Sequence, residues 1–256
     1  MLPELTATRY VTPLKEGGSL PGIVEADDDG TYVLKFRGAG QGLKVLVAEV
    51  LVAGLARLID VPVPDLAVIS LDARIAKYEA DEEVQDLLTK SIGSNLGVDF
   101  LPGALGYDGG RPPSADLAER IIWLDAFTAN VDRTWSNPNL LVWHGRTWAI
   151  DHGAALYFHH SWPSRAPDPA RFAAQAFDAS THVLRDVAGD VASRHSELAA
   201  RLTPAAIEDA VGMVPDSWLE TTPDLVDAAA VRGAYLTFLR ARLVGGTTWL
   251  PGGAAS

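Results

Sequence analysis

Apolar residues follow two different spacings along the chain, and the spacing changes after about the first third. Short apolar runs bounded by turn residues predict three strands, over residues 23–26, 31–36 and 66–71. Residues 44–58 between them have helical spacing, and Pro62 and Pro64 then favour an extended segment. The first part of the chain is therefore predicted to be β-rich with one internal helix.

From about residue 71 onward the pattern becomes mainly helical. Helices are expected over residues 80–88, 115–129, 169–176, 183–202, 204–211 and 223–244. Ser114 suits the N-cap of the second of these, and Thr203 followed by Pro204 suits the start of the fifth. Residues 93–113 are rich in glycine and proline and predict an irregular loop. This segregation predicts an α+β fold with two lobes, residues 1–72 and 73–256.

One hairpin interrupts the helical part. Leu140–Trp143 and Arg146–Ile150 are rich in aromatic and β-branched residues, and they flank a turn at His144-Gly145. A turn centred there sets the register, which places Asn137 and Asn139 across from Asp151 at the open end. Asp132 lies a few residues upstream, in the loop that leads into that end. The hairpin therefore gathers carboxylate and carboxamide oxygens in one place.

Composition narrows the class of protein. The chain has 256 residues, of which 48% are hydrophobic, no cysteine, and a formal net charge of −12. Without cysteine there is no disulfide, no thiolate metal ligand and no thiol nucleophile. The negative charge argues against direct nucleic-acid binding, which depends on Lys and Arg at the phosphates. We see no signal peptide and no apolar run of about 18 residues that would span a membrane, so a cytoplasmic protein is expected.

Two charged residues occur within apolar segments. Lys35 lies in a predicted strand, and Glu49 is the only charge between Lys44 and Arg57 in the predicted helix. A carboxylate on an apolar helix face is unfavourable unless a cation meets it, and Lys35 is the nearest candidate in sequence. The alternative, that each charge reaches solvent at the edge of its element, explains these two residues equally well.

The set Asp132, Asn137 and Asp151 suits a hard divalent cation, because Mg²⁺ prefers carboxylate and carbonyl oxygens together with substrate phosphates. Asx turns in loops explain the same residue types, and taken alone they are the simpler explanation. Gly17-Gly18-Ser19 before a strand could wrap a phosphate with backbone N–H groups, although surface turns use the same residues. The chain has no Walker motif, no His-Glu-x-x-His and no nucleophile elbow.

Taken in order, these pieces resemble the protein-kinase-like fold, and specifically the HipA-like and phosphatidylinositol-kinase-like bacterial kinases. The matching parts are a glycine-containing phosphate loop, a strand lysine, a helix glutamate, the loop Asn130-Val131-Asp132-Arg133 through Asn137, and Ile150-Asp151-His152-Gly153. The spacing of five residues from Asp132 to Asn137 is that of kinase catalytic loops. The resemblance covers roughly residues 17–153.

The resemblance implies a role for each of these residues. Lys35, held by Glu49, would contact the ATP phosphates together with Gly17, Gly18 and Ser19. Asp132 would orient or deprotonate the acceptor hydroxyl, and Asn137 and Asp151 would hold Mg²⁺. Adenine would bind backbone groups of a hinge over 68–72, which includes Ile69, Ser70 and Leu71.

The implied activity is ATP- and Mg²⁺-dependent transfer of phosphate to a hydroxyl, most simply Ser or Thr of a protein or peptide. Two features depart from the family pattern: Thr134 stands where many relatives have His, and the glycine loop is short. A pseudokinase that binds nucleotide and regulates a partner is therefore an alternative. A kinase for a small molecule such as a sugar, an antibiotic or a lipid is another, since related folds phosphorylate these.

Overall fold

The computed structural model describes residues 1–14, 20–40, 42–77 and 79–252, and it divides into two units. The first unit comprises Met1–Leu46 and Pro64–Pro102, and the second comprises Val47–Val63 and Gly103–Ser256. This division does not coincide with the predicted boundary after residue 72, because one strand of the first unit, Gly93–Asp99, comes later in the chain. None of the helices in these ranges is both long and apolar enough to span a bilayer.

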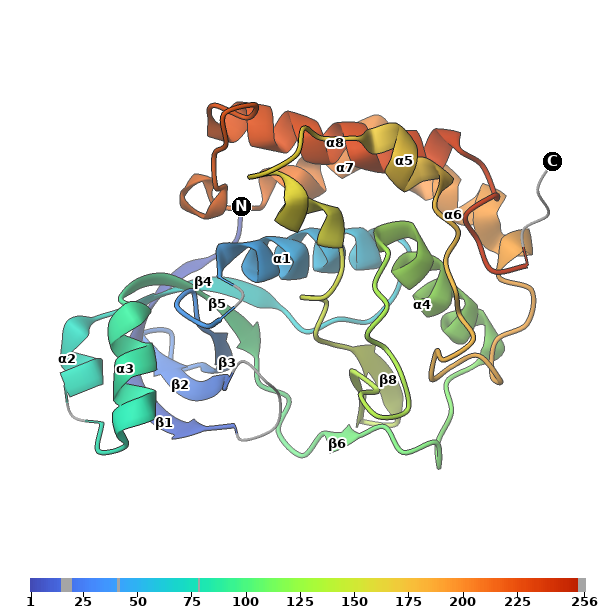
Figure 1. Ribbon diagram of the computed structural model, residues 1–256. Coiled ribbons are helices and arrows are strands. Elements are labelled where there is room, and N and C mark those ends of the chain that lie inside the picture. The colour runs from blue at the N-terminus through green and yellow to red at the C-terminus, as the bar shows by residue number, and fades with distance from the viewer. Residues whose placement is uncertain (15–19, 41, 78, 253–256) are drawn as a thin grey trace. The chain divides into compact units, whose positions relative to one another are not determined.

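The first unit is a small closed barrel with the strand order β1-β2-β3-β5-β4 (Figure 1). Its strands are β1 (Glu4–Pro13), β2 (Gly22–Ala26), β3 (Thr31–Lys35), β4 (Leu66–Leu71) and β5 (Gly93–Asp99). The barrel closes where β1 runs parallel to β4, with Leu5 opposite Ile69. Side chains alternate across each strand, so every second residue enters one shared core. That core includes Val24, Leu34 and Ile69.

Two short helices accompany the barrel, α2 (Ala73–Lys77) and α3 (Glu82–Lys90). Asp81 begins α3 as its N-cap, since its carboxylate accepts from the N–H groups of Glu83 and Val84. Val84 and Leu88 on the buried face of α3 join the barrel core. The remaining face of this acidic helix is left to solvent, so the helix is amphipathic.

The prediction that residues 93–113 form an irregular loop is wrong. They contain β5 and the short strand β6 (Leu105–Gly106), and β5 pairs with both β3 and β4. Gly97 explains the error, because a Cβ atom there would lie 2.3 Å from Cδ1 of Ile69. A glycine that reads as a loop residue is in fact required by close packing inside a strand. Strand β1 was not foreseen, because nothing in its own pattern shows that it closes a barrel.

The second unit contains most of the helices and a three-stranded sheet ordered β6-β7-β8. Its long helices are α4 (Ala115–Thr128), α7 (Pro204–Gly212) and α8 (Ala228–Val244), with the shorter α5 (Pro169–Ala174) and α6 (His195–Arg201) and three 3-10 turns (Tyr157–Ser161, Ala192–Arg194 and Asp216–Trp218). Helix α1 (Leu43–Leu58) passes from the first unit into the second at Val47. Within the second unit α5 and α7 lie beside α8 (Figure 1). Two predicted helices were too long: only 195–201 of 183–202 is α-helix, and 223–244 begins at Ala228.

The hairpin β7 (Leu140–Trp143) and β8 (Arg146–Ala149) agrees with its prediction. Leu140 pairs with Ala149 and Trp143 with Arg146, so the turn is His144-Gly145 as expected. Both turn residues have positive φ, 48° and 73°, which is the conformation of the two-residue turns that match the twist of paired strands. The predicted register at the open end of the hairpin follows from this turn.

Candidate functional site

The loop that carries Asp132 is a tight and heavily bonded structure. The N–H of Thr134 donates to the carbonyl of Asn137, and the N–H of Asn137 donates back to Thr134, both at 3.1 Å. This pair of bonds leaves a two-residue turn between them. Across its base, Nδ2 of Asn137 donates to Oδ2 of Asp132 at 2.8 Å. The amide oxygen of Asn137 is then the atom of that side chain suited to a cation, and both side chains are exposed.

Asp151 directly follows the last rung of the hairpin. The N–H of Ile150 donates to the carbonyl of Asn139 at 3.0 Å, which extends the pairing of β7 and β8 by one step. Asn139 and Asp151 both have positive φ, 48° and 54°. Asn and Asp tolerate this left-handed conformation best among residues that carry a Cβ. The loop of Asp132 and the segment of Asp151 therefore leave the same end of the hairpin.

Arg133 ties these two segments to a helix. Its buried guanidinium donates to the carboxylate of Asp125 through Nε at 2.7 Å and Nη2 at 3.3 Å. Through Nη1 it also donates to the carbonyl of Ile150 at 3.2 Å and to the carbonyl of Asn139. One side chain thus connects α4 to both strand ends at the open end of the hairpin. Asp132 directly precedes Arg133 in the chain, so the bonds of Arg133 also fix the position of the Asp132 backbone.

Asp125 is the centre of the network, and sequence reasoning missed it. Besides Arg133, its carboxylate accepts from Nδ2 of Asn130 and Nε2 of His182, each at 3.0 Å. Nδ1 of His182 accepts from the N–H of Leu184, so the ring proton is on Nε2. Burial by itself would raise the pKa of Asp125, but the charge of Arg133 and the bonds from His182 and Arg133 hold that pKa well below its usual range.

A signal for Asp125 was present in the sequence. It is a lone carboxylate in the apolar run 121–127, which is the same kind of signal that drew attention to Glu49. No local pattern reveals that its partner is His182, which lies 57 residues further along the chain. The segment of His182 reaches the loop through the N–H of Val183, which donates to the carbonyl of Arg133 at 3.1 Å.

The residues predicted to bind nucleotide are distributed over the two units. Lys35 ends β3 in the first unit, opposite Leu96 and only partly exposed. Glu49 belongs to the part of α1 in the second unit, and its side chain is 3% exposed. Their pairing stays a prediction. Gly17, Gly18 and Ser19 lie outside the described residues.

The predicted hinge is an interior strand. Ile69 and Ser70 have partners on both sides, in β1 and in β5, whereas Leu71 pairs only with Gly93 of β5. Of these three residues, Leu71 is therefore the one that pairs with a strand on one side only. If adenine binds backbone groups of this segment, the end of β4 suits it better than the middle.

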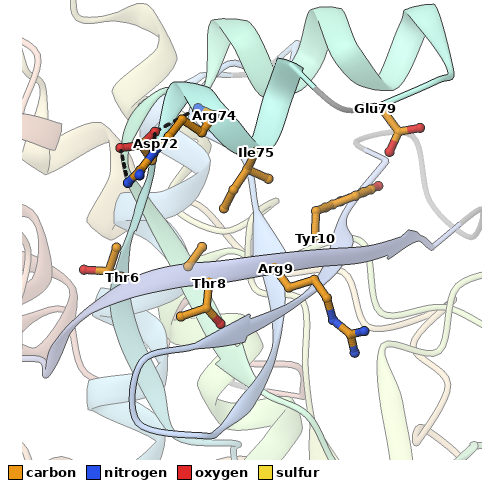
Figure 2. Close-up of a pocket in the computed structure, with 9 residues that line it drawn as sticks. Thr6, Thr8, Arg9, Tyr10, Asp72, Arg74, Ile75 and Glu79 are labelled. Carbon is orange, nitrogen blue, oxygen red and sulfur yellow. Dashed lines mark hydrogen bonds and ion pairs between the residues drawn. The ribbon is translucent and has the colours of Figure 1, made fainter.

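The first unit has a cleft of about 590 Å³, and it is not the predicted site (Figure 2). It lies between β1 and the start of α2, and its lining residues are Thr6, Ala7, Thr8, Arg9, Tyr10, Asp72, Arg74, Ile75 and Glu79. Both arginines already have carboxylate partners, Arg9 with Glu25 and Arg74 with Asp72. Asp72, the last residue of the predicted hinge, lines this cleft, but none of the predicted catalytic or metal-binding residues does, so we assign it no part in phosphoryl transfer.

The side chains around the hairpin match the chemistry of a hard cation that also binds phosphate. In the described part of the chain, no group of three or more His, Cys, Asp or Glu side chains could hold a metal ion by itself. Asn137 and Asp151 together present one amide oxygen and one carboxylate. Mg²⁺ commonly takes only one or two protein ligands and fills its remaining positions with water and substrate phosphates. The donor set therefore fits Mg²⁺ that is delivered with a nucleotide.

Comparisons with known proteins show what this chain is similar to. The model of the HipA-like kinase family matches residues 8–241. The crystal structure of the Helicobacter pylori proinflammatory kinase CtkA is similar over 98% of this chain and 95% of that chain, at 10% identity and a TM-score of 0.55. A search of curated proteins found no match.

Two structures of the Golgi casein kinase, one with Mn/ADP bound, are similar at lower scores. Each is 11% identical and covers 94% of this chain, with TM-scores of 0.47 and 0.45, and the match spans 72% and 73% of those chains. At these identities the likeness to CtkA shows the fold and nothing finer. The predicted α+β kinase-like fold is confirmed at that level.

Proposed function

This chain belongs to the HipA-like kinase family, and on that premise we propose that it transfers the γ-phosphate of ATP, with Mg²⁺, to a serine or threonine hydroxyl of a protein or peptide. As a member of that family it is a kinase, which confirms the predicted resemblance and enzyme class. The observation that supports a role of this loop in phosphoryl transfer is its bonding from Asp132 to Asn137, with its base fixed by Arg133. A loop that is rigid before substrate arrives loses little entropy when it orients a reacting group.

Asp132 is the proposed catalytic residue. Its Oδ2 already accepts from Asn137, so Oδ1 is the atom directed to the hydroxyl of the acceptor. In the reaction the acceptor oxygen bonds to the γ-phosphorus, the bond to the β,γ-bridging oxygen breaks, and ADP leaves. The hydroxyl proton passes to Asp132. Since phosphoryl transfer has a loose transition state, orientation of the hydroxyl contributes more than strong basicity.

Lys35 and Glu49 are the proposed phosphate-binding pair. Lys35 would neutralise charge on the α- and β-phosphates, and Glu49 would hold the lysine in position. Glu49 is almost fully buried on an apolar helix, where a carboxylate is strongly unfavourable without a cationic or hydrogen-bonding partner. This burial supports a role for Glu49 beyond a solvated surface charge.

Asn137 and Asp151 are the proposed Mg²⁺ ligands. Bound Mg²⁺ would neutralise charge on the transferring phosphoryl group. The residues of the chain position these two ligands: Asn137 through its bond to Asp132, and Asp151 through the Ile150–Asn139 rung that Arg133 holds.

Two variants test the proposal and separate its parts. Asp132→Ala is expected to lower phosphoryl transfer to a peptide by about 10²–10⁴-fold and to leave the thermal shift caused by Mg²⁺-ATP in place. Asp151→Ala is expected to lower transfer and also to remove the part of that shift that depends on Mg²⁺. Asp86→Ala, at an exposed position on α3, is the control and should behave as wild type.

Transfer at the wild-type rate in both active-site variants would refute the proposed roles. A chain that shows the Mg²⁺-dependent shift but no turnover would instead be a pseudokinase, the alternative favoured by Thr134. Labelled phosphate that enters only small molecules of a cell lysate would point to a small-molecule acceptor.

A further inference from the structure

An exposed tryptophan stands in the loop that carries Asp132. Trp135 is the first residue of the two-residue turn between Thr134 and Asn137, and 57% of its surface is exposed. The turn is closed by two backbone bonds, so the indole projects from a rigid base. Trp135 follows Asp132 by three positions, which the chain can span in at most about 10 Å. An acceptor residue that closely flanks the hydroxyl at Asp132 is therefore within reach of this ring.

The indole of Trp135 packs against Tyr107 and Gly109. Tyr107 stacks on it with 6.1 Å between ring centroids and 24° between planes, and Tyr107 itself is buried. The backbone at Gly109 also lies against the indole, since a Cβ atom there would be 3.0 Å from Cη2 of Trp135. The indole is thus held by the loop at these contacts, while more than half of its surface remains exposed. A preorganised aromatic face of this kind binds planar or cationic groups at small entropic cost.

Negative charge borders the ring. Asp108 follows Tyr107 directly, and its Oδ1 accepts from the N–H of Gly110 at 2.8 Å, which fixes an exposed carboxylate beside the stack. Burial, and then the charge of Asp108, raise the pKa of the Tyr107 hydroxyl. Arg111 of the same loop is exposed and forms no ion pair with Asp108. Asp132, three positions before Trp135 in the same loop, is a second exposed carboxylate.

We propose that Trp135, Tyr107 and Asp108 form an aromatic-acidic platform that receives an arginine side chain of the protein acceptor, within about three residues of the phosphorylated serine or threonine. The proposal rests on the protein-kinase function proposed above, and it deepens that function by naming the sequence class of the acceptor. A guanidinium suits the platform because it can stack on an indole face and donate to a carboxylate at its edge at the same time. Lysine would satisfy the charge but stack less well.

The test compares peptides that differ at one flanking position. The full chain is assayed with Mg²⁺-ATP and a set of serine peptides that carry Arg, Lys, Ala, Phe or Glu at each position up to three residues from the serine. The measured quantity is the ratio of kcat/KM for the Arg peptide to that for the Ala peptide. We expect wild type to favour the Arg peptide at one position by roughly 2- to 30-fold, the range of a single cation–π contact.

Variants then locate the source of the preference. Trp135→Ala should bring the ratio close to one, mainly through a higher KM for the Arg peptide, and Trp135→Phe should retain part of it. Asp108→Asn should lower it to an intermediate value. Val244→Ala, which shortens another highly exposed apolar side chain, should leave the ratio unchanged. Far-UV circular dichroism and melting temperature establish that each variant is folded.

The outcomes separate the two proposals. If wild type phosphorylates peptides but the ratio is near one, or if Trp135→Ala keeps the wild-type ratio, the platform is overturned and the kinase proposal stands. A preference for Phe over Arg would overturn the cationic occupant. If no peptide is phosphorylated, protein-kinase activity fails, and the platform fails with it.

Discussion

The network around Asp125 predicts a large effect from a very small chemical change. Replacing Asp125 by Asn keeps the shape of the side chain but exchanges one acceptor oxygen for an NH₂ group. The described partners of this carboxylate are all donors: Arg133 at 2.7 and 3.3 Å, and Asn130 and His182 at 3.0 Å each. The carboxamide of Asn has a single oxygen, so it can accept only from the donors that reach this oxygen. It also leaves the buried charge of Arg133 without a counter-charge.

The expected loss is about 3–5 kcal/mol, the usual consequence of removing one partner from a buried ion pair. Proteins are stable by only about 5–15 kcal/mol, so this is a substantial fraction of the total. The measurement is urea unfolding followed by circular dichroism, with wild type and Asp125→Asn compared at pH 7. Glu208→Gln is the matched control, because it makes the same chemical change in an exposed ion pair with Arg240 and should alter stability by less than about 1 kcal/mol.

Unfolding at low pH gives a second, independent measure of the stability that Asp125 contributes. The pKa of Asp125 is lowered in the folded chain, so its contribution to stability is complete above the unfolded value and is lost as the pH falls through the folded value. The free-energy gap between wild type and Asp125→Asn should therefore narrow as the pH is lowered below about 4. If Asp125→Asn unfolds within about 1 kcal/mol of wild type at pH 7, like the exposed control, the reasoning about this network is refuted.

Three further substitutions test other parts of the fold by urea or thermal unfolding. Gly97→Ala should destabilise by about 1–3 kcal/mol because its Cβ would lie 2.3 Å from Cδ1 of Ile69, and Ile69→Val in the same chain should recover part of the loss; no recovery would show that the contact is not the cause. Arg242→Met should cost about 1–3 kcal/mol, since the buried guanidinium donates to three backbone carbonyls, and an unchanged melting temperature would contradict this role. Gly145→Ala should cost about 1–2 kcal/mol from its φ of 73° alone, whereas Gly106→Ala in the same sheet, without a positive φ, should be neutral; equal effects would count against the turn argument.

Local chemistry was sufficient for part of this structure. The hairpin was predicted with its turn and register because His144-Gly145 is a short-range signal that acts on its immediate neighbours. Helix α4 begins after Ser114 as expected, since an N-cap depends only on the next few residues. The ordered motif around Asp132 was likewise readable along the chain, and it led to the family that the comparison over residues 8–241 confirms.

The remaining features depend on segments that meet only in the folded chain. The glycines of β5 predict a loop because they signal flexibility locally, whereas the contact that requires Gly97 comes from Ile69 on another strand. β1 is a strand of the barrel because of its pairing with β4, more than 60 residues away in sequence.

Asp125 shows most clearly the difference between what the sequence reveals and what the tertiary structure decides. The chain reveals an isolated carboxylate in an apolar helix, which is unfavourable without partners, but it does not reveal which partners it has. Arg133 and His182 reach it from two different loops, and through Arg133 it fixes the ends of the hairpin beside Asp132. Local patterns therefore determine the elements and the order of the reactive residues, whereas long-range packing determines how these residues are supported, because burial and pairing exist only once distant segments are in contact.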